Sequence, residues 1–243
     1  MSMPYAVSKK LVISGNFLEI YDYQKPYWVG YPQIRSFREN TKVVDQVALR
    51  DDNVRRTRQK IRRLINCNRN LDRFFTITFA ENKTDLRSAN VLFNQFVKRL
   101  RRLYPDFQYL GVPEFQKRGA VHYHLLCNLP FIDENELTKI WGNGFCWLRR
   151  VDSVDNLGAY ISKYLGKANF DKRYFKMRKF FYSMNLLKSV VVDNLKDIVK
   201  FMRTIPKCFY EKVYNTEVFT KYLGMVQYEQ IRVSSLIKVG SHL

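Results

Sequence analysis

The stretch FQYLGVPEFQKRGAVHYHLLC, residues 107–127, predicts a β-hairpin and decides the fold class of the chain. Its two arms, Phe107–Phe115 and Ala120–Cys127, are rich in aromatic and β-branched residues, which favour strands. The four residues between them, QKRG, end in glycine, as short hairpin loops often do. Because strand side chains alternate between faces, His122 and His124 are predicted to point to the same face of a sheet.

Helices and strands alternate on both sides of this hairpin. FFTITF at Phe74–Phe79 predicts a strand, and the apolar spacing in Thr84–Tyr104 predicts an amphipathic helix. From residue 74 onward the order is β-α-β-β-α-β-α, which predicts an α+β fold with a central antiparallel sheet and helices packed on one face. The other expected elements are two strands in Lys10–Tyr23 with a turn at Gly15-Asn16, helices at Thr41–Asn68, Glu134–Trp141, Val154–Lys167 and Leu195–Met202, and strands at Phe145–Val151, Cys208–Tyr214 and Met225–Ile231.

The length of 243 residues suits one domain with appendages or two small domains. We expect N-terminal strands and an extension at 1–40, a core at 41–170, and a C-terminal extension at 171–243 packed on the same domain. The 42 lysines and arginines exceed the 22 acidic residues and give a net charge of +20, which indicates a polyanionic partner. Nucleic acid is the first candidate, because no single amphipathic helix carries the charge that a membrane surface would require.

Several classes of protein are disfavoured by the sequence. No run of about 18 apolar residues could span a bilayer, and Met1–Lys10 is too polar for a signal peptide, so we expect a cytoplasmic protein. Cysteines occur at irregular spacings and never as C-x-x-C, which argues against a structural zinc site and a disulfide framework. We expect four buried thiols, at Cys67, Cys127, Cys146 and Cys208.

The histidine pair is a candidate metal site. Two neutral imidazoles on one face of a strand can hold one divalent ion, and Glu114 is expected across the hairpin from His122 and His124. Two histidines and one carboxylate leave coordination positions open for water or a phosphate oxygen, as in catalytic metal sites. The plainer alternative, two hydrogen-bonded histidines on a sheet face, is weakened by the carboxylate and by the basic loop residues Lys117 and Arg118.

A doubled Y-x-x-K pattern lies on the predicted helix Val154–Lys167 and consists of Tyr160, Lys163, Tyr164 and Lys167. Residues four apart share a helix face, so both phenols and both ammonium groups are expected along one edge. A tyrosine can attack a phosphodiester covalently, and lysines can hold the phosphate and the phenolate. Because a phosphotyrosine keeps the energy of the broken bond, resealing needs no nucleotide cofactor. Consistently, Gly166-Lys167 lacks the other residues of a Walker A loop.

A basic run on the expected helix Thr41–Asn68 is a candidate phosphate contact. RRTRQKIRR holds six basic residues and no acid, and it could equally be a solvated helix face. The six residues are Arg55, Arg56, Arg58, Lys60, Arg62 and Arg63.

The stretches FFTITF, VHYHLL and YISKYLGK, in this order, resemble the three motifs of HUH-superfamily rolling-circle replication initiators. The closest likeness is to bacterial plasmid and phage replication proteins, of which EFQKRGAVHYH is typical. The resemblance is strong over Phe74–Lys167 and weak in the flanks. H-x-H followed downstream by Y-x-x-K is specific in combination. The resemblance implies an HUH, or split βαβ-like, nuclease fold.

The resemblance also implies roles for these residues. His122 and His124 would bind Mg²⁺ or Mn²⁺ with Glu114 as third ligand, and Tyr160 or Tyr164 would nick single-stranded origin DNA. The nick would leave a 5′-phosphotyrosine and a free 3′-OH that primes synthesis, and the strand would later be rejoined. Relatives with two tyrosines at this spacing are of the bacteriophage type. A superfamily-3 helicase domain is absent, so a host helicase and polymerase in a bacterial cytoplasm are expected partners.

Two other functions compete with replication initiation. An HUH transposase would use the same histidine pair, usually with one tyrosine, and its gene would lie between hairpin ends. A conjugative relaxase fits less well, because its tyrosine typically precedes the histidines. A non-enzymatic nucleic-acid-binding protein would need only the charge and the 15% aromatic residues, and it would retain DNA without cutting it.

Overall fold

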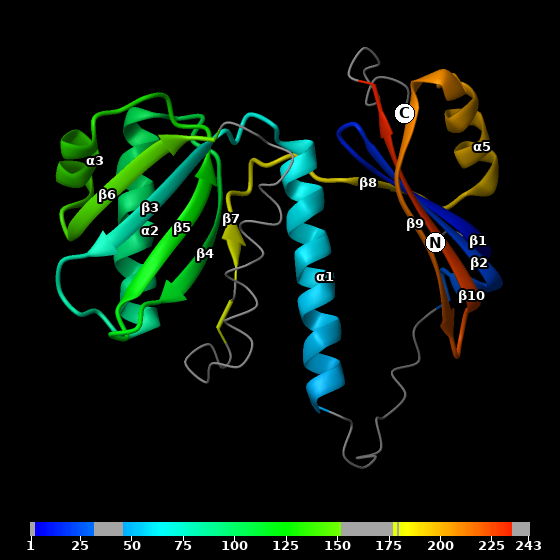
Figure 1. Cartoon of the computed structure of the whole chain (residues 1–243), viewed down its shortest axis with the longest axis horizontal. Coiled ribbons are helices and arrows are strands. Elements are labelled where there is room, and N and C mark those ends of the chain that lie inside the picture. Colours follow the sequence, from blue (N-terminus) through cyan, green and yellow to red (C-terminus); the bar gives the residue numbers. More distant parts are fainter. Residues whose placement is uncertain (1–2, 32–45, 152–176, 179, 235–243) are drawn as a thin grey trace. The chain divides into compact units, whose positions relative to one another are not determined.

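The computed structural model describes residues 3–31, 46–151, 177–178 and 180–234. These residues belong to two compact units (Figure 1). One unit contains residues 45–187 and is called the hairpin unit here, and the other combines residues 1–44 with 188–243 and is called the terminal unit. The three segments expected from the sequence follow chain order, whereas the terminal unit joins segments from both ends of the chain.

The hairpin unit is built on a five-stranded antiparallel sheet with the strand order β6-β3-β5-β4-β7. The predicted hairpin is confirmed as β4 and β5, and Gly119 closes its turn at a φ of 90°, which glycine adopts without strain. The strands are β3 (Arg73–Phe79), β4 (Tyr109–Phe115), β5 (Val121–Cys127), β6 (Gly144–Arg150) and β7 (Phe181–Tyr182).

Two helices cover one face of this sheet, α2 (Leu86–Leu103) and α3 (Glu134–Trp141). Each begins after an aspartate, Asp85 or Asp133, whose carboxylate accepts hydrogen bonds from backbone N–H groups of the first turn. Their apolar faces pack on the odd-numbered side chains of the strands. The buried cluster includes Phe75, Ile77, Tyr123 and Leu125 from the sheet, Phe93, Phe96 and Leu100 from α2, and Trp141 from α3.

A third helix, α1 (Gln46–Cys67), packs on the opposite face of the sheet. Its buried side chains Ile61, Leu64 and Ile65 contact even-numbered strand residues, among them Phe74 and Leu126. The expectation that helices would cover one face was therefore wrong. The apolar edge of α1 needs a buried surface, and the strands offer apolar side chains on both faces at this end of the sheet.

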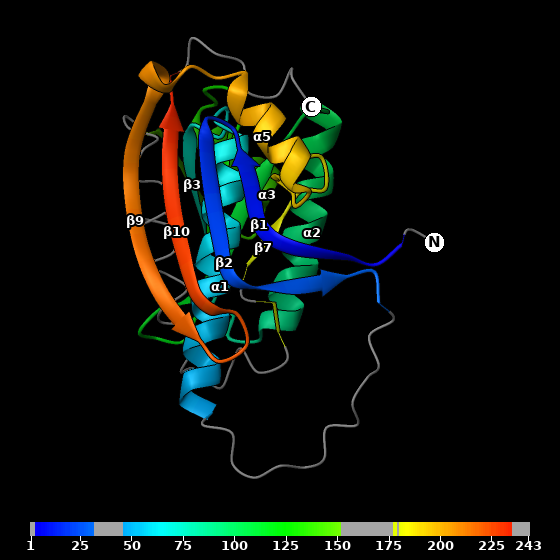
Figure 2. The same cartoon turned by 90° about the vertical axis from the view of Figure 1, so that its right-hand side faces the viewer.

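The terminal unit is a second five-stranded antiparallel sheet with the order β8-β1-β2-β10-β9 (Figure 2). The sequence predicted one central sheet, so the α+β class is confirmed but the number of sheets is larger. Helix α5 (Leu195–Arg203) packs Ile198 and Phe201 against Leu11, Leu18 and Ile231. The strands are β1 (Tyr5–Ser14), β2 (Phe17–Val29), β8 (Val190–Val192), β9 (Tyr210–Thr220) and β10 (Gly224–Val233).

Two further expectations are tested by the described residues. No helix among them is long and apolar enough to cross a membrane. All four cysteines are free thiols, but only Cys127 and Cys146 are buried, and burial raises the pKa of each to about 12. Cys67 is half-buried and Cys208 is exposed, so the expectation of four buried thiols was wrong for these two. Cys208 lies in the short 3₁₀ turn Lys207–Phe209, whose residues are not part of the buried core.

Candidate functional site

The register of the sheet brings the two histidines and Glu114 to one face, opposite α2 and α3. His122 lies between Glu114 on β4 and Thr78 on β3, and His124 lies between Val112 and Thr76. The next row contains Leu110, Leu126 and Phe74, which α1 covers. The histidines therefore follow directly after the apolar contact between α1 and the sheet.

His124 is held in a fixed orientation by three neighbours. Its Nε2 atom lies 2.9 Å from Oε2 of Glu114, and its Nδ1 atom lies 3.4 Å from the hydroxyl of Thr76. The ring stacks on Phe74, with centroids 5.8 Å apart and an interplanar angle of 17°. In the simplest protonation pattern, Nε2–H donates to the carboxylate and the threonine hydroxyl donates to Nδ1. These contacts limit the rotation of the imidazole and point Nε2 toward Glu114.

His122 has a buried ring nitrogen that makes no hydrogen bond within the protein. Its side chain is buried, and its Nε2 atom has no hydrogen-bond partner in the described part of the chain. Desolvation is the largest cause that lowers its pKa, to about 4; His124 and Arg118 lower the pKa further, and Glu114 raises it. At neutral pH the imidazole is therefore uncharged, which is the state that binds metal ions. A buried nitrogen without a partner is costly unless a ligand supplies one.

The chemistry of these donors fits a divalent cation. An octahedral Mg²⁺ has bonds of about 2.1 Å, so two adjacent ligand atoms lie about 3 Å apart. The separation of 2.9 Å between His124 Nε2 and Glu114 Oε2 matches that spacing once Nε2 gives up its proton. His122 offers the third donor. As placed, the centroids of the two imidazoles are 6.3 Å apart, and no three His, Cys, Asp or Glu side chains of the described residues converge on one point, so His122 would have to turn.

The loop residues Lys117 and Arg118 lie in the turn between β4 and β5 and are exposed. Arg118 donates from Nε to the side-chain oxygen of Gln116 and from Nη2 to the carbonyl oxygen of Phe79. Because its charge lowers the pKa of His122, the guanidinium lies within electrostatic reach of the imidazole. The turn therefore places positive charge beside the histidine pair, where a phosphate would gain from it.

The basic run on α1 faces outward. Five of its six cationic residues are exposed and Arg63 is half-buried, while the apolar residues of the same helix are buried. Lys60 is partly engaged within the protein, because its ammonium lies 5.6 Å from the ring centroid of Phe180 and 5.3 Å from that of Tyr182. This geometry suits phosphate contacts and a solvated face equally well. The exposed residues are Arg55, Arg56, Arg58, Lys60 and Arg62.

Tyr160, Lys163, Tyr164 and Lys167 lie outside the described residues. Their placement relative to the histidines stays a prediction of the sequence.

Three side chains of the edge strand β6 share the face of the histidines, and the sequence did not predict them as part of a site. Phe145, Trp147 and Arg149 are exposed, and the register places them opposite Thr78, Thr76 and Phe74. The alternation in FCWLRR was a usable signal, because the intervening Cys146 and Leu148 are apolar and buried under the helices.

Comparison with known proteins gives one match. No curated protein and no solved structure matches the chain. The model of the ORF2-type replication-associated protein family matches residues 72–169, a segment that runs from the start of β3 through the histidine pair and beyond both tyrosines. The family match is consistent with a replication initiator and indicates DNA as a partner.

Proposed function

We propose that the chain starts rolling-circle replication by cutting single-stranded origin DNA with a tyrosine, as HUH-superfamily initiators do. The observation that carries this proposal is the arrangement of His122, His124 and Glu114 on one sheet face, within the segment that matches a replication-associated family. The lowered pKa of His122, its unpartnered nitrogen and the ligand-like spacing of His124 and Glu114 support a divalent metal site.

The protein residues have separable roles in this proposal. His122, His124 and Glu114 would hold Mg²⁺ or Mn²⁺, and Phe74 and Thr76 would keep His124 oriented. A bound divalent ion would polarise the scissile phosphate and stabilise the leaving 3′ oxygen. Arg118 and Lys117 would contact neighbouring phosphates from the adjacent turn.

The covalent step would use Tyr160 or Tyr164. The phenol oxygen attacks the phosphorus and loses its proton, the bond between phosphorus and the 3′ oxygen breaks, and that oxygen takes up a proton. The products are a 5′-phosphotyrosine and a free 3′-OH, and Lys163 and Lys167 would hold the phosphate and the phenolate. Rejoining is the reverse reaction, so it needs no nucleotide. Unwinding and extension would fall to a host helicase and polymerase.

A cutting assay on a random single-stranded DNA library tests the proposal even though the origin sequence is not known. The protein is incubated with the library and Mn²⁺, denatured, and examined for protein that carries covalent DNA, and the attached ends are sequenced. We expect an adduct at a defined sequence, lost in the Tyr160→Phe/Tyr164→Phe double variant and retained in the matched control Tyr222→Phe, whose tyrosine is 82% exposed in the terminal unit. DNA retention without any adduct would instead favour a non-enzymatic binder.

A transposase would pass the same chemical test. Transposition and replication initiation differ in what flanks the gene, since a transposase gene lies between hairpin ends and an initiator gene lies near an origin. The match to a replication-associated family favours the initiator.

A further inference from the structure

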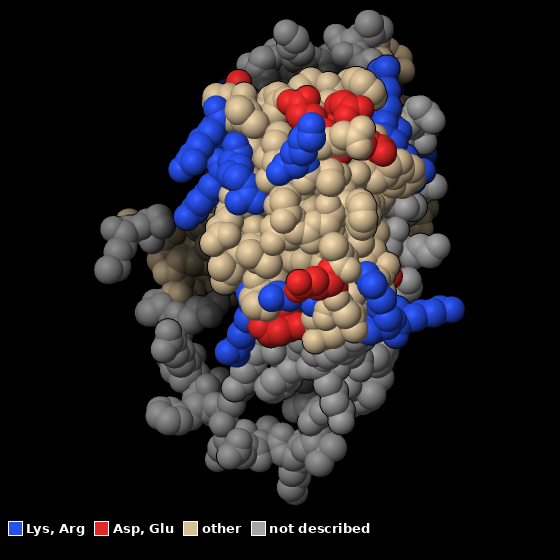
Figure 3. Space-filling view, turned by 90° about the vertical axis from the view of Figure 1, so that its left-hand side faces the viewer, with Lys and Arg blue, Asp and Glu red and all other residues tan. Residues whose placement is uncertain are grey.

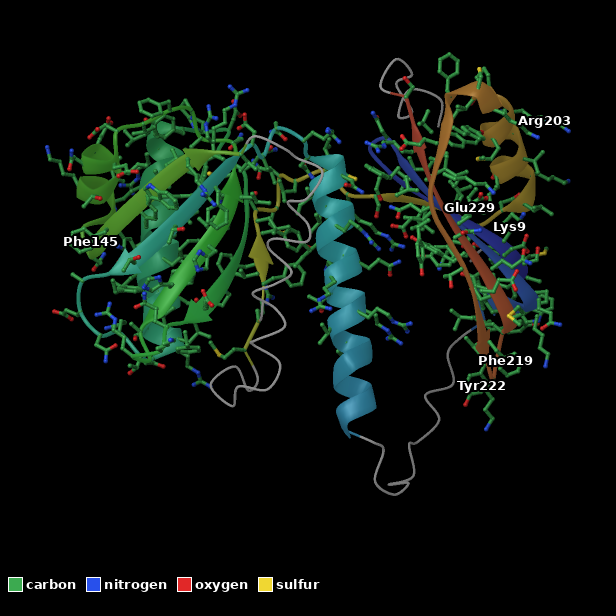
Figure 4. All side chains as sticks on the ribbon, in the orientation of Figure 1. Lys9, Phe145, Arg203, Phe219, Tyr222 and Glu229 are labelled. Atoms are coloured by element: carbon green, nitrogen blue, oxygen red, sulfur yellow. The ribbon has the colours of Figure 1, made fainter. Side chains whose placement is uncertain are left out.

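An aromatic stripe, formed by Phe145 and Trp147, lies along β6 on the face of the histidine pair. Phe145 is 66% exposed and Trp147 is 46% exposed, and the next residue on that face is the exposed Arg149. Figure 4 labels Phe145 at the outer side of the sheet, on the strand that forms its edge. Cys146 and Leu148 alternate with the stripe and are buried in the core, so the strand cannot rotate to bury the two aromatic rings.

The stripe is aligned with the candidate metal site by the strand register. Phe145 is in the row of Thr78, His122 and Glu114, and Trp147 is in the row of Thr76 and His124. Each aromatic residue is therefore two strands away from a histidine, or about 10 Å. Arg149 connects the two features, because its guanidinium lies 4.9 Å from the ring centroid of Trp147 and 5.3 Å from that of Phe74, on which His124 stacks.

The spacing and charge of the stripe suit single-stranded nucleic acid. A single exposed aromatic residue needs no explanation, but two at successive positions of one face form a surface that water solvates poorly. Their backbone positions are about 7 Å apart, which is twice the stacking distance of about 3.4 Å between bases, so one base fits between two rings. Duplex DNA hides its base faces, whereas a single strand offers them.

The surroundings also favour a polyanion. Arg149 and Arg150 end the strand with two exposed cations directly after the aromatic rings. Figure 3, which views the hairpin unit from the side of β6 and α3, shows a broad uncharged area with groups of lysine and arginine at its borders. Cations at an edge strand disfavour pairing with a strand of a second protein copy, since they would be brought against the other copy's cations.

We propose that Phe145 and Trp147 stack on bases of a single DNA strand, whose phosphates contact Arg149 and Arg150 as the strand leads to the histidine pair. This inference rests on the proposed function, in that the stacked strand is the one to be cut. Because the separation of about 10 Å equals about three stacked nucleotides, the stacked bases lie within about three nucleotides of the cut phosphate.

Tryptophan fluorescence tests the stacking directly. The full chain has three tryptophans, of which Trp141 is buried and Trp28 is exposed in the terminal unit, so the assay uses the Trp28→Phe background. Short oligo-dT is titrated in EDTA at low salt, where no cutting can occur. We expect quenching of Trp147 fluorescence on binding, absent in Trp147→Phe, and an affinity loss of roughly 5- to 150-fold in Trp147→Ala.

Abasic DNA distinguishes stacking from general damage to the fold. An abasic oligonucleotide keeps the phosphates and lacks bases, so Trp147→Ala and Phe145→Ala should bind it as well as the unchanged protein does. Phe131→Ala is the matched control, because Phe131 is 85% exposed outside the stripe and should leave oligo-dT binding unchanged. Unquenched fluorescence, or equal weakening toward dT and abasic DNA, would overturn the proposal, as would self-association that Trp147→Ala abolishes.

The two proposals fail separately. Normal quenching in a protein that never forms a covalent adduct refutes the cutting function and leaves DNA stacking in place. Normal cutting without quenching refutes the stacking surface alone.

Discussion

Replacing Glu114 by glutamine separates a metal ligand from a structural hydrogen-bond partner. Glutamine keeps the length and hydrogen-bonding shape of the side chain but removes its negative charge. The carboxylate now lies 2.9 Å from His124 Nε2 and raises the pKa of the neighbouring His122. Its removal therefore has two consequences that can be measured independently, one on cation affinity and one on the titration of His122.

The first consequence is weaker binding of Mn²⁺. Loss of one charged group at a metal site typically lowers affinity by a factor of about 10 to 100. We expect a loss of at least this size in a Mn²⁺ titration followed by electron paramagnetic resonance, without DNA. Glu136→Gln is the matched control, because Glu136 is an exposed carboxylate of α3 on the other face of the sheet, and its loss should leave Mn²⁺ affinity unchanged.

The second consequence is a lower pKa at His122. The pKa of this imidazole is about 4 in the folded protein, so about one molecule in a thousand is protonated at pH 7. Because Glu114 raises that pKa, Glu114→Gln should shift the NMR titration midpoint of His122 further down. Local unfolding would do the opposite, since exposure to water returns an imidazole toward about 6.5. A raised midpoint, or an unchanged Mn²⁺ affinity, would refute the reasoning.

Four further outcomes follow from the same structure. His122→Ala and His124→Ala should each abolish cutting yet keep most DNA affinity, measured by gel shift beside the adduct assay; full cutting by the double variant would remove the metal assignment. Replacing Arg55, Arg56 and Arg58 by alanine should flatten the slope of log affinity against log salt by about 0.7 for each phosphate that is no longer neutralised, and an unchanged slope would make the run a solvated face. One of Tyr160→Phe and Tyr164→Phe should still cut, both should fail in repeated rounds, and mass spectrometry should find the first phosphotyrosine on Tyr160; an adduct only on Tyr164 would reverse that order. Asp85→Ala should lower the free energy of unfolding by about 1 kcal/mol, because α2 loses its N-cap, and chemical denaturation should detect the change.

The local pattern of the chain predicted much of the hairpin unit. The expected strand Phe74–Phe79 corresponds to β3, and the expected helix Glu134–Trp141 is observed with the same bounds. Alternation along β5 was enough to predict that both histidines share a face, because period two is a property of the strand itself. The side chain that Glu114 contacts could not be predicted, since it bonds His124 diagonally rather than His122 directly across.

The terminal unit was harder to predict because its sheet is assembled from distant segments. β2 pairs with β10, so Tyr21 lies opposite Tyr228, and no local pattern specifies a partner about two hundred residues away. The expected strand Cys208–Tyr214 captured only the start of β9, whose exposed residues lack a clean alternation. The stripe on β6 was overlooked for a different reason, since the short run FCWLRR has apolar residues on both faces and by itself predicts a buried strand.

The pairing of β2 with β10 has a consequence for the order in which the chain folds. The hairpin unit is one continuous segment, so all of its contacts are available before residues 188–243 are synthesised. The sheet of the terminal unit cannot close until β10 has left the ribosome, and until then the β1–β2 pair exposes open edges to other chains. Newly made protein should therefore be most prone to aggregation in the interval after the hairpin unit is complete, and a chain stopped at residue 187 should remain in that vulnerable state.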